Sequence, residues 1–129
     1  MDIKTHDKID QRLCGRPVAV GDKTSRIEFT ATKDMAVDET GLVHGGFVFG
    51  LADHAAMLAV NHPNVVLGGA DVKFLQPVRV GEPLWAEAKV MESVKNRHMV
   101  DVTVTFKKRP VLTGRLVCFV PDRHVLKRN

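Results

Sequence analysis

The longest apolar stretch of the chain, residues 45–60, constrains the fold more than any other feature of the sequence. Only two of its side chains, Asp53 and His54, can ionise, and apolar residues occupy nearly every face of the helix that it would form. A helix that is hydrophobic all round is a buried helix. A carboxyl group inside such a helix is costly to bury unless it is paired or used, so Asp53 is the first residue that needs an explanation.

A His-Gly-Gly turn precedes this helix. Gly45 and Gly46 have no Cβ atom, so another group can approach their backbone closely, and the first amides of a helix have no partner within it. Together with the positive end of the helix dipole, these amides suit an oxygen that carries or develops negative charge, such as a carbonyl that becomes an oxyanion. The glycines could instead only let a core helix pack, with Asp53 as a cap. The buried acid moves the balance toward a functional site.

The size and composition of the chain are those of one ordinary domain. We expect a single domain over residues 1–129, with a polar segment at residues 1–15 and a basic tail at residues 121–129. No run is long enough to span a membrane, and the first residues lack the apolar centre of a secretory signal. Cys14 and Cys118 have no spacing typical of a zinc site or a disulfide framework. We therefore expect a cytoplasmic protein with no metal and no membrane partner.

The net charge of +4 is unevenly distributed along the chain. Residues 1–65 hold 7 Lys/Arg against 9 Asp/Glu, whereas residues 66–129 hold 12 against 6. A basic second half suits a polyanionic ligand, either nucleic acid or a phosphate-bearing cofactor, and a solvated basic surface is an equally good explanation. Because tyrosine is absent and no nucleic-acid-binding motif is present, we expect no nucleic-acid partner.

Alternation of apolar and polar residues predicts strands at residues 16–20, 25–32, 65–78, 84–94, 97–108 and 111–120. The pair Gly68-Gly69 predicts a bulge, and Pro63 ends the helix. Short turns join the four strands after the helix, and short turns make neighbouring strands antiparallel. One curved sheet covers only one side of a buried helix. We therefore expect a second copy of the chain on the other side, in a homodimer or a homotetramer built as a dimer of dimers.

Two segments resemble a known family. His44-Gly-Gly-Phe-Val-Phe-Gly-Leu-Ala-Asp53 is similar to the signature of acyl-coenzyme A thioesterases of the phenylacetic-acid-pathway (PaaI-like) type, and Phe74-Leu-Gln-Pro-Val-Arg-Val-Gly-Glu82 resembles the segment after that family's helix. The resemblance covers residues 16–120. It implies the hotdog fold, an α+β fold in which a curved antiparallel sheet wraps around one long central helix. It also implies thioester hydrolysis without a metal, a serine nucleophile or a separate cofactor, because coenzyme A is part of the substrate.

By position, the resemblance implies that Asp53 is the catalytic carboxylate, as general base or nucleophile. The Gly45 amide would be the oxyanion donor, and His44 would help to hold the turn. Substrate contacts are implied at Gly46, Phe74 and Asp38. Two departures from the family pattern concern the reaction. Asp38 stands where the family often has Asn or Gln, and no Ser or Thr occurs between residues 62 and 92, where many members have a hydroxyl.

The spacing of Gly45 and Asp53 has a geometric consequence. Eight residues of helix separate them by about 12 Å at 1.5 Å per residue. Reacting groups must lie within roughly 3–3.5 Å, so one thioester cannot touch both in one chain. Two antiparallel helices across a two-fold axis would bring Gly45 near the partner's Asp53. For the phosphates of coenzyme A, the expected contacts are Lys95, Arg97, Lys107, Lys108 and Arg109, although each alone is more often a solvated charge.

The alternative to a thioesterase is a non-catalytic module that binds or senses acyl-coenzyme A, because ligand-sensing hotdog domains occur in fatty-acid repressors. We expect the 15–20 residues before the first strand to be too few for a DNA-binding domain, so such a module would act through a partner. A hydratase ranks third, since nothing resembles its Asp/His segment. We expect structural or surface roles for His54 and His62 and an inert core thiol at Cys118, while Trp85 either lines a pocket or packs.

Overall fold

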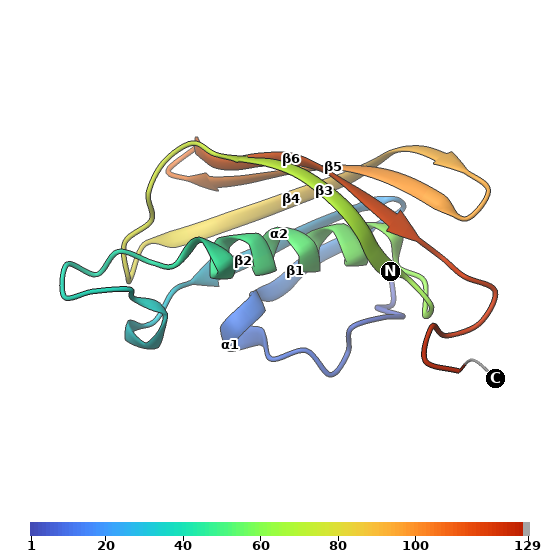
Figure 1. The fold of residues 1–129 in the computed structure, drawn as a ribbon, viewed down its shortest axis with the longest axis horizontal. Helices are drawn as coiled ribbons and strands as arrows, with labels where there is room; N and C mark the ends of the chain where they lie inside the picture. The colour runs from blue at the N-terminus through green and yellow to red at the C-terminus, as the bar shows by residue number, and fades with distance from the viewer. Residues whose placement is uncertain (128–129) are drawn as a thin grey trace.

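In the computed structural model, which describes residues 1–127, one long helix lies against one face of a six-stranded antiparallel sheet (Figure 1). The helix is α2 (Gly45–Val60). The strands are β1 (Arg16–Gly21), β2 (Thr24–Thr30), β3 (Val66–Phe74), β4 (Pro83–Val94), β5 (Arg97–Phe106) and β6 (Arg109–Phe119). Two short elements, α1 (Gln11–Cys14) and the 3-10 helix η1 (Lys33–Met35), complete the described structure. The predicted hotdog fold is confirmed.

Local signals in the sequence set both ends of α2. His44 caps the first turn, because its Nδ1 accepts a hydrogen bond from the Gly46 amide at 2.8 Å. Asn61 ends the helix in the left-handed conformation, with φ of 53°, which asparagine tolerates better than most residues. Between these caps, Leu51 and Leu58 are completely buried. Full burial of a leucine side chain contributes about 1.5–3 kcal/mol, so these contacts fix α2 on the sheet.

The strand order β1-β2-β4-β5-β6-β3 corrects one expectation. Short turns do make β4, β5 and β6 an antiparallel meander, but β3 pairs with β6 instead of with β4. The predicted third strand ends early, at Phe74, because residues 75–82 form a connection from one side of the sheet to the other. That connection is held by backbone bonds from Val43 to the Val78 carbonyl and from Val80 to the Gly41 carbonyl, both 2.8 Å. The bulge is confirmed, since the β3–β6 register shifts between Leu67 and Gly69.

Residues 1–15, which we call the N-terminal strap, correct a second expectation. Instead of leaving the outer side of α2 bare, the strap crosses it on the side away from the sheet (Figure 1). Thr5 in the strap is buried. The strap therefore covers part of the helix surface that we assigned to a second copy of the chain. No helix among residues 1–127 is long and apolar enough to cross a membrane.

Candidate active site

The Asp53 carboxyl group is half-buried and incompletely hydrogen-bonded. Its Oδ1 atom is buried and has no hydrogen-bond partner among residues 1–127. Burial disfavours the charged form and raises the pKa of Asp53 to about 6. A carboxyl group with this pKa is largely ionised at neutral pH and still accepts a proton readily, which is what a general base near pH 7 requires.

Two thiols lie close enough to Asp53 to feel its charge. Burial raises the pKa of Cys14 in α1, and the negative charge of Asp53 raises it further. The same two causes, in the same order, raise the pKa of Cys118 in β6 to about 12. Asp53 therefore lies within reach of α1 and of β6, and both thiols stay protonated at neutral pH.

The two glycine amides at the start of α2 differ in their hydrogen bonding. The Gly46 amide donates to His44 Nδ1 at 2.8 Å, and the Phe47 amide donates to the His44 carbonyl at 3.1 Å. The Gly45 amide has no acceptor among residues 1–127. The donor that remains free for an incoming oxygen is thus Gly45, while His44 holds the turn that presents it.

Phe74, at the end of β3, lies against Gly45. A Cβ atom on Gly45 would come 3.3 Å from Phe74 Cε1, so the turn and the ring approach each other closely. Beside them is a hollow of about 290 Å³. Its walls are mostly apolar, and its lining residues are Val43, Gly45, Val48, Phe74, Gln76, Pro77 and Val78.

Sequence reasoning did not single out Val43, Val48 or Gln76 for this hollow. Val43 lies in the hollow because its amide donates a hydrogen bond to the Val78 carbonyl. This bond holds the segment before α2 against the connection at residues 75–82. Gln76 reaches it because residues 75–82 cross beside the start of α2. The only signal in the sequence was the segment that follows Phe74, which resembles the family but does not reveal its path.

Asp38 is not among the residues that line this hollow. It is exposed, and its Oδ1 accepts hydrogen bonds from the Thr40 hydroxyl at 2.6 Å and from the Thr40 amide at 2.9 Å. These bonds, the hydroxyl first, lower the pKa of Asp38. The structure therefore ties Asp38 into its own turn as an ionised carboxylate and does not place it in the lining of the hollow beside Gly45.

The five predicted phosphate contacts form two groups. Lys95 and Arg97 lie at the β4–β5 turn, and residues 107–109 lie at the β5–β6 turn. The 10 residues of β5 separate the turns by roughly 30 Å. Phe74 pairs with Leu112, three residues after Arg109, so the second group lies at the end of the sheet where Phe74 meets Gly45. Within one protomer, the five residues cannot contact the same phosphates.

Three other side chains have structural surroundings. His54 is 2 % exposed, with its Nδ1 3.0 Å from the Cys14 carbonyl oxygen, as expected for a structural histidine. Cys118 is fully buried, as expected for an inert core thiol. The ring of Trp85 packs under the guanidinium of Arg26 at 4.0 Å and also lines a separate hollow. Among residues 1–127, no group of three His, Cys, Asp or Glu side chains is placed to hold a metal ion.

A long helix against a curved antiparallel sheet, with a half-buried carboxyl on that helix and an amide at its start that has no acceptor among residues 1–127, is the arrangement of a hotdog-fold protein. The sequence profile described as "Thioesterase superfamily" matches residues 40–113, more than half of the chain. The chain belongs to the thioesterase superfamily.

Solved structures with the same fold agree with this assignment. An uncharacterized protein of Pyrococcus horikoshii is 45% identical, with 98% of each chain covered and a TM-score of 0.97. The PaaI protein from the phenylacetic acid degradation operon of E. coli is 23% identical over 92% of this chain and 88% of that one, with a TM-score of 0.82. A hypothetical thioesterase of Streptococcus pneumoniae, solved with coenzyme A, is 18% identical over 84% and 87%, with a TM-score of 0.75. The last two likenesses concern the fold alone.

Two curated relatives are longer proteins. Methylthioribose-1-phosphate isomerase of Aquifex aeolicus is 53% identical over 92 residues, which are 71% of this chain and 20% of that protein. The transcription factor FapR of Caldanaerobacter subterraneus subsp. tengcongensis is 29% identical over 101 residues, which are 78% of this chain and 50% of that protein. The chain thus matches a fifth of the first relative and half of the second.

Proposed function

We propose that the chain hydrolyses the thioester of an acyl-coenzyme A to a free acid and coenzyme A. The observation that carries this proposal is the Asp53 carboxyl, with its pKa of about 6, on the helix that begins at the Gly45 amide. Within residues 1–127, the buried Oδ1 of Asp53 and the Gly45 amide both lack a hydrogen-bond partner. The Gly45 amide would stabilise the oxyanion that forms on the thioester carbonyl. The carboxylate would either take a proton from the attacking water or attack the carbonyl carbon itself.

The proposal places each site between two chains. Asp53 follows Gly45 by eight residues in one unbroken helix, a rise of about 12 Å. The edge strand β3 is the favourable place for a second copy, because an edge strand offers unpaired backbone groups. The opposite edge, β1, contains Pro17 and a register shift, both of which discourage pairing.

Pairing of β3 strands about a two-fold axis would place two α2 helices side by side and antiparallel. The open surface of α2 permits such an approach, since Gly46 is exposed and a Cβ atom on Gly50 would have no neighbour within 4 Å in the described part of the chain. We therefore propose a homodimer with two shared sites. A tetramer built from two such dimers would keep both sites.

We assign the coenzyme A phosphates to the basic β5–β6 turn, because this turn lies at the Phe74 end of the sheet. Replacing Lys107 by Asn and Lys108 by Gly should raise KM for acyl-coenzyme A about 3- to 10-fold, since each exposed charge pair contributes about 0.2–1 kcal/mol. Both lysines have positive φ, which Asn and Gly adopt easily, so the turn should keep its shape. The measurement is KM at low and high salt, because salt screens exposed charges.

The comparison substrate for this variant is a short thioester without the nucleotide, whose KM should respond neither to the substitutions nor to salt. Lys95→Asn, at the opposite turn and also at positive φ, is the matched control and should leave both KM values unchanged. Equal effects on the two substrates would contradict the assignment of the phosphates to residues 107–109.

The likeness to FapR favours a second candidate, a non-catalytic module that binds acyl-coenzyme A. Thiol release from a panel of short, long and aromatic acyl-coenzyme A substrates separates the two functions. A hydrolase should release thiol over many turnovers from at least one of these substrates. Stoichiometric binding by calorimetry without thiol release from any of them would favour the binding module.

A further inference from the structure

Asn61, directly after α2, fastens the beginning of the N-terminal strap. Its Nδ2 donates to the Asp2 carbonyl oxygen at 2.8 Å, and its Oδ1 accepts from the Lys4 amide, also at 2.8 Å. One side chain therefore satisfies a donor and an acceptor of the strap backbone. Such a pair of bonds fixes both the position and the direction of residues 2–4 relative to the end of the helix.

His54, the residue after Asp53, fastens the strap at a second point. Its ring stacks on the ring of His6, with centroids 6.4 Å apart and planes inclined by 22°. His54 Nδ1 lies 3.0 Å from the carbonyl oxygen of Cys14, so the neutral ring donates a hydrogen bond to the end of α1. Thr5, beside His6, is buried and its hydroxyl lies 2.8 Å from His6 Nδ1. The strap is thus fastened to α2 at the residue next to Asp53, and its Cys14 lies close enough to feel the charge of Asp53.

Exposure changes along one face of α2, and the change falls at Asp53. Positions 46, 50, 53 and 57 follow one another at intervals of three and four residues and so share one face of the helix. Gly46 on this face is exposed, and the surroundings of Gly50 are open. Asp53 is half-buried, and Met57 is 1 % exposed. The half of this face before Asp53 is open, and the half after it is covered.

We propose that the N-terminal strap is a positioning element for Asp53, which excludes water from one side of the carboxyl while the other side stays open to substrate. The inference rests on the proposed function, because it concerns the carboxylate that would act there. The strap would then set the acidity of the base without contacting the substrate.

The charges around Asp53 leave burial as the cause of its raised pKa. The groups close enough to feel its charge are the thiols of Cys14 in α1 and Cys118 in β6. The neighbouring residue His54 stacks on His6 of the strap. Both thiols have raised pKa values and are neutral at pH 7. Burial lowers the pKa of His54 and of His6, and for His6 the charge of His54 adds to this effect, so both rings are neutral as well. Removing the cover should therefore lower the pKa of Asp53.

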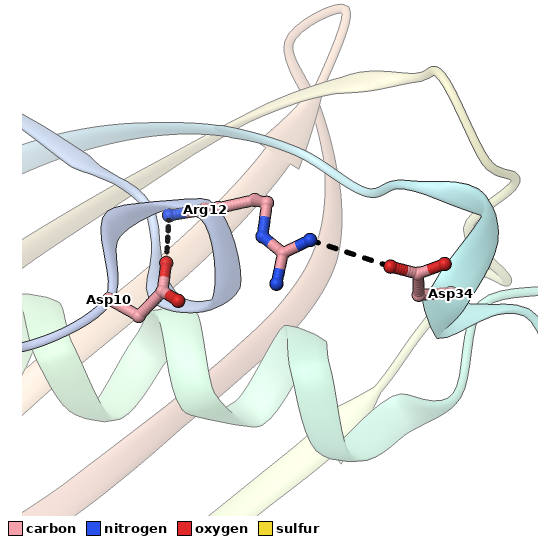
Figure 2. A network of polar contacts seen from close by, with 3 residues as sticks. All are labelled: Asp10, Arg12 and Asp34. Carbon is pink, nitrogen blue, oxygen red and sulfur yellow. Dashed lines mark hydrogen bonds and ion pairs between the residues drawn. The ribbon is translucent and has the colours of Figure 1, made fainter.

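An ion pair at the surface of α1 provides a control residue. Asp10 caps α1 through a bond from the Arg12 amide at 2.9 Å, and the Arg12 guanidinium reaches Asp34 at 3.5 Å across the surface (Figure 2). Both partners of this ion pair are well exposed, and exposed pairs contribute little. Asp34→Asn changes a carboxylate near the strap without changing the cover of Asp53.

The test compares the pH dependence of kcat/KM for the full chain, a variant lacking residues 2–9, and Asp34→Asn. In the full chain, activity should fall as the pH drops through about 6, where Asp53 takes up a proton. In the shortened variant this acidic limb should move toward about 4, the ordinary value of an aspartate. Asp34→Asn should keep the limb of the full chain. A folded shortened variant whose limb stays near 6 would overturn the proposal.

A second variant covers the case in which the shortened chain does not fold. Asn61→Gly removes both bonds to the strap but suits the left-handed backbone at this position. Amide hydrogen exchange at residues 2–6 measures whether the strap is released. The pKa of the Asp53 carboxyl is then measured by NMR titration. A released strap with Asp53 still titrating near 6 also overturns the proposal. Because the NMR titration needs no turnover, it decides the role of the strap even if the full chain hydrolyses no thioester and the proposed function fails.

Discussion

Replacing Asp53 by Asn should reduce thioester hydrolysis roughly 10²- to 10⁴-fold, the usual contribution of a positioned general base. Asparagine keeps the shape of the side chain but has no anionic oxygen, so the general-base and nucleophilic roles are lost together. The measurement is kcat for thiol release at pH 8, where the carboxyl group of the wild-type chain is ionised. Asp101→Asn, on a partly exposed carboxylate that pairs with Arg115, is the matched control and should keep full activity.

The same substitution should change stability in a direction that depends on pH. Burial raises the pKa of Asp53 to about 6, above the ordinary value of about 3.9 that it has in the unfolded chain. Above pH 6 the folded state holds a charge that burial disfavours, and below about pH 4 the carboxyl is neutral in both states. The Tm of Asp53→Asn relative to the wild type should therefore be higher at pH 8 than at pH 4.

A structural cap would behave differently from a catalytic carboxylate in both measurements. If Asp53 only accepted hydrogen bonds, its replacement by Asn would leave most of the activity, and the Tm would fall at pH 8 because the charge would have been stabilising. Retained hydrolysis in Asp53→Asn would therefore remove Asp53 from the proposed mechanism. The Oδ1 atom accepts no hydrogen bond from the described residues 1–127, which argues against this structural role.

The bounds of α2 could be predicted because their causes are local. His44 and the two glycines mark the start, and Asn61 followed by a proline two residues later marks the end. The partner of β3 could not be predicted in this way. The sequence places β3 next to β4, whereas the sheet pairs β3 with β6, because residues 75–82 cross to the other side of the sheet. Such a crossing depends on contacts between distant segments, which periodicity does not encode.

In the candidate site, too, local features could be predicted from the sequence and contacts between distant segments could not. Asp53 and the Gly45 amide could be identified from one helix, since an acid in an apolar run and a glycine turn are visible in sequence. The strap could not, because residues 1–15 have no regular pattern and several of their contacts use backbone atoms of Asp2, Lys4 and Cys14. Backbone contacts leave almost no signal in residue types. The division of the basic residues between two turns also became clear only from the length of β5.

The shared site gives a further prediction, which first requires the dimer itself. Sedimentation at micromolar concentration should give at least twice the chain mass of 14.3 kDa. A stable monomer would contradict both the dimer and the site between two chains. For the next step, two inactive chains are needed, each lacking a different half of the site. Asp53→Asn removes the carboxylate, and Gly45→Pro removes the amide donor.

Gly45→Pro is compatible with the start of α2. Proline is favoured at the first position of a helix, and the preceding His44 already has the extended backbone that proline requires, with φ of −61° and ψ of 130°. The atoms nearest to a Cβ atom at this position belong to the exposed ring of Phe74. Gly45→Ala is the matched control, since it makes the same contact with Phe74 but keeps the amide. It should remain active, whereas Gly45→Pro should be inactive.

When an Asp53→Asn chain pairs with a Gly45→Pro chain, both substitutions fall in one of the two sites and the other site is intact. Mixed dimers purified through two different tags should therefore recover about half of the wild-type activity per dimer, although each parent homodimer is inactive, because one of two independent sites is restored. If both residues acted within the same chain, every site of the mixed dimer would carry one lesion and no activity would return. An active Gly45→Pro homodimer would instead show that another donor stabilises the oxyanion. Recovery to half, with inactive parents and an active Gly45→Ala control, is expected only when the Gly45 amide of one chain and the Asp53 carboxylate of its partner act on the same thioester.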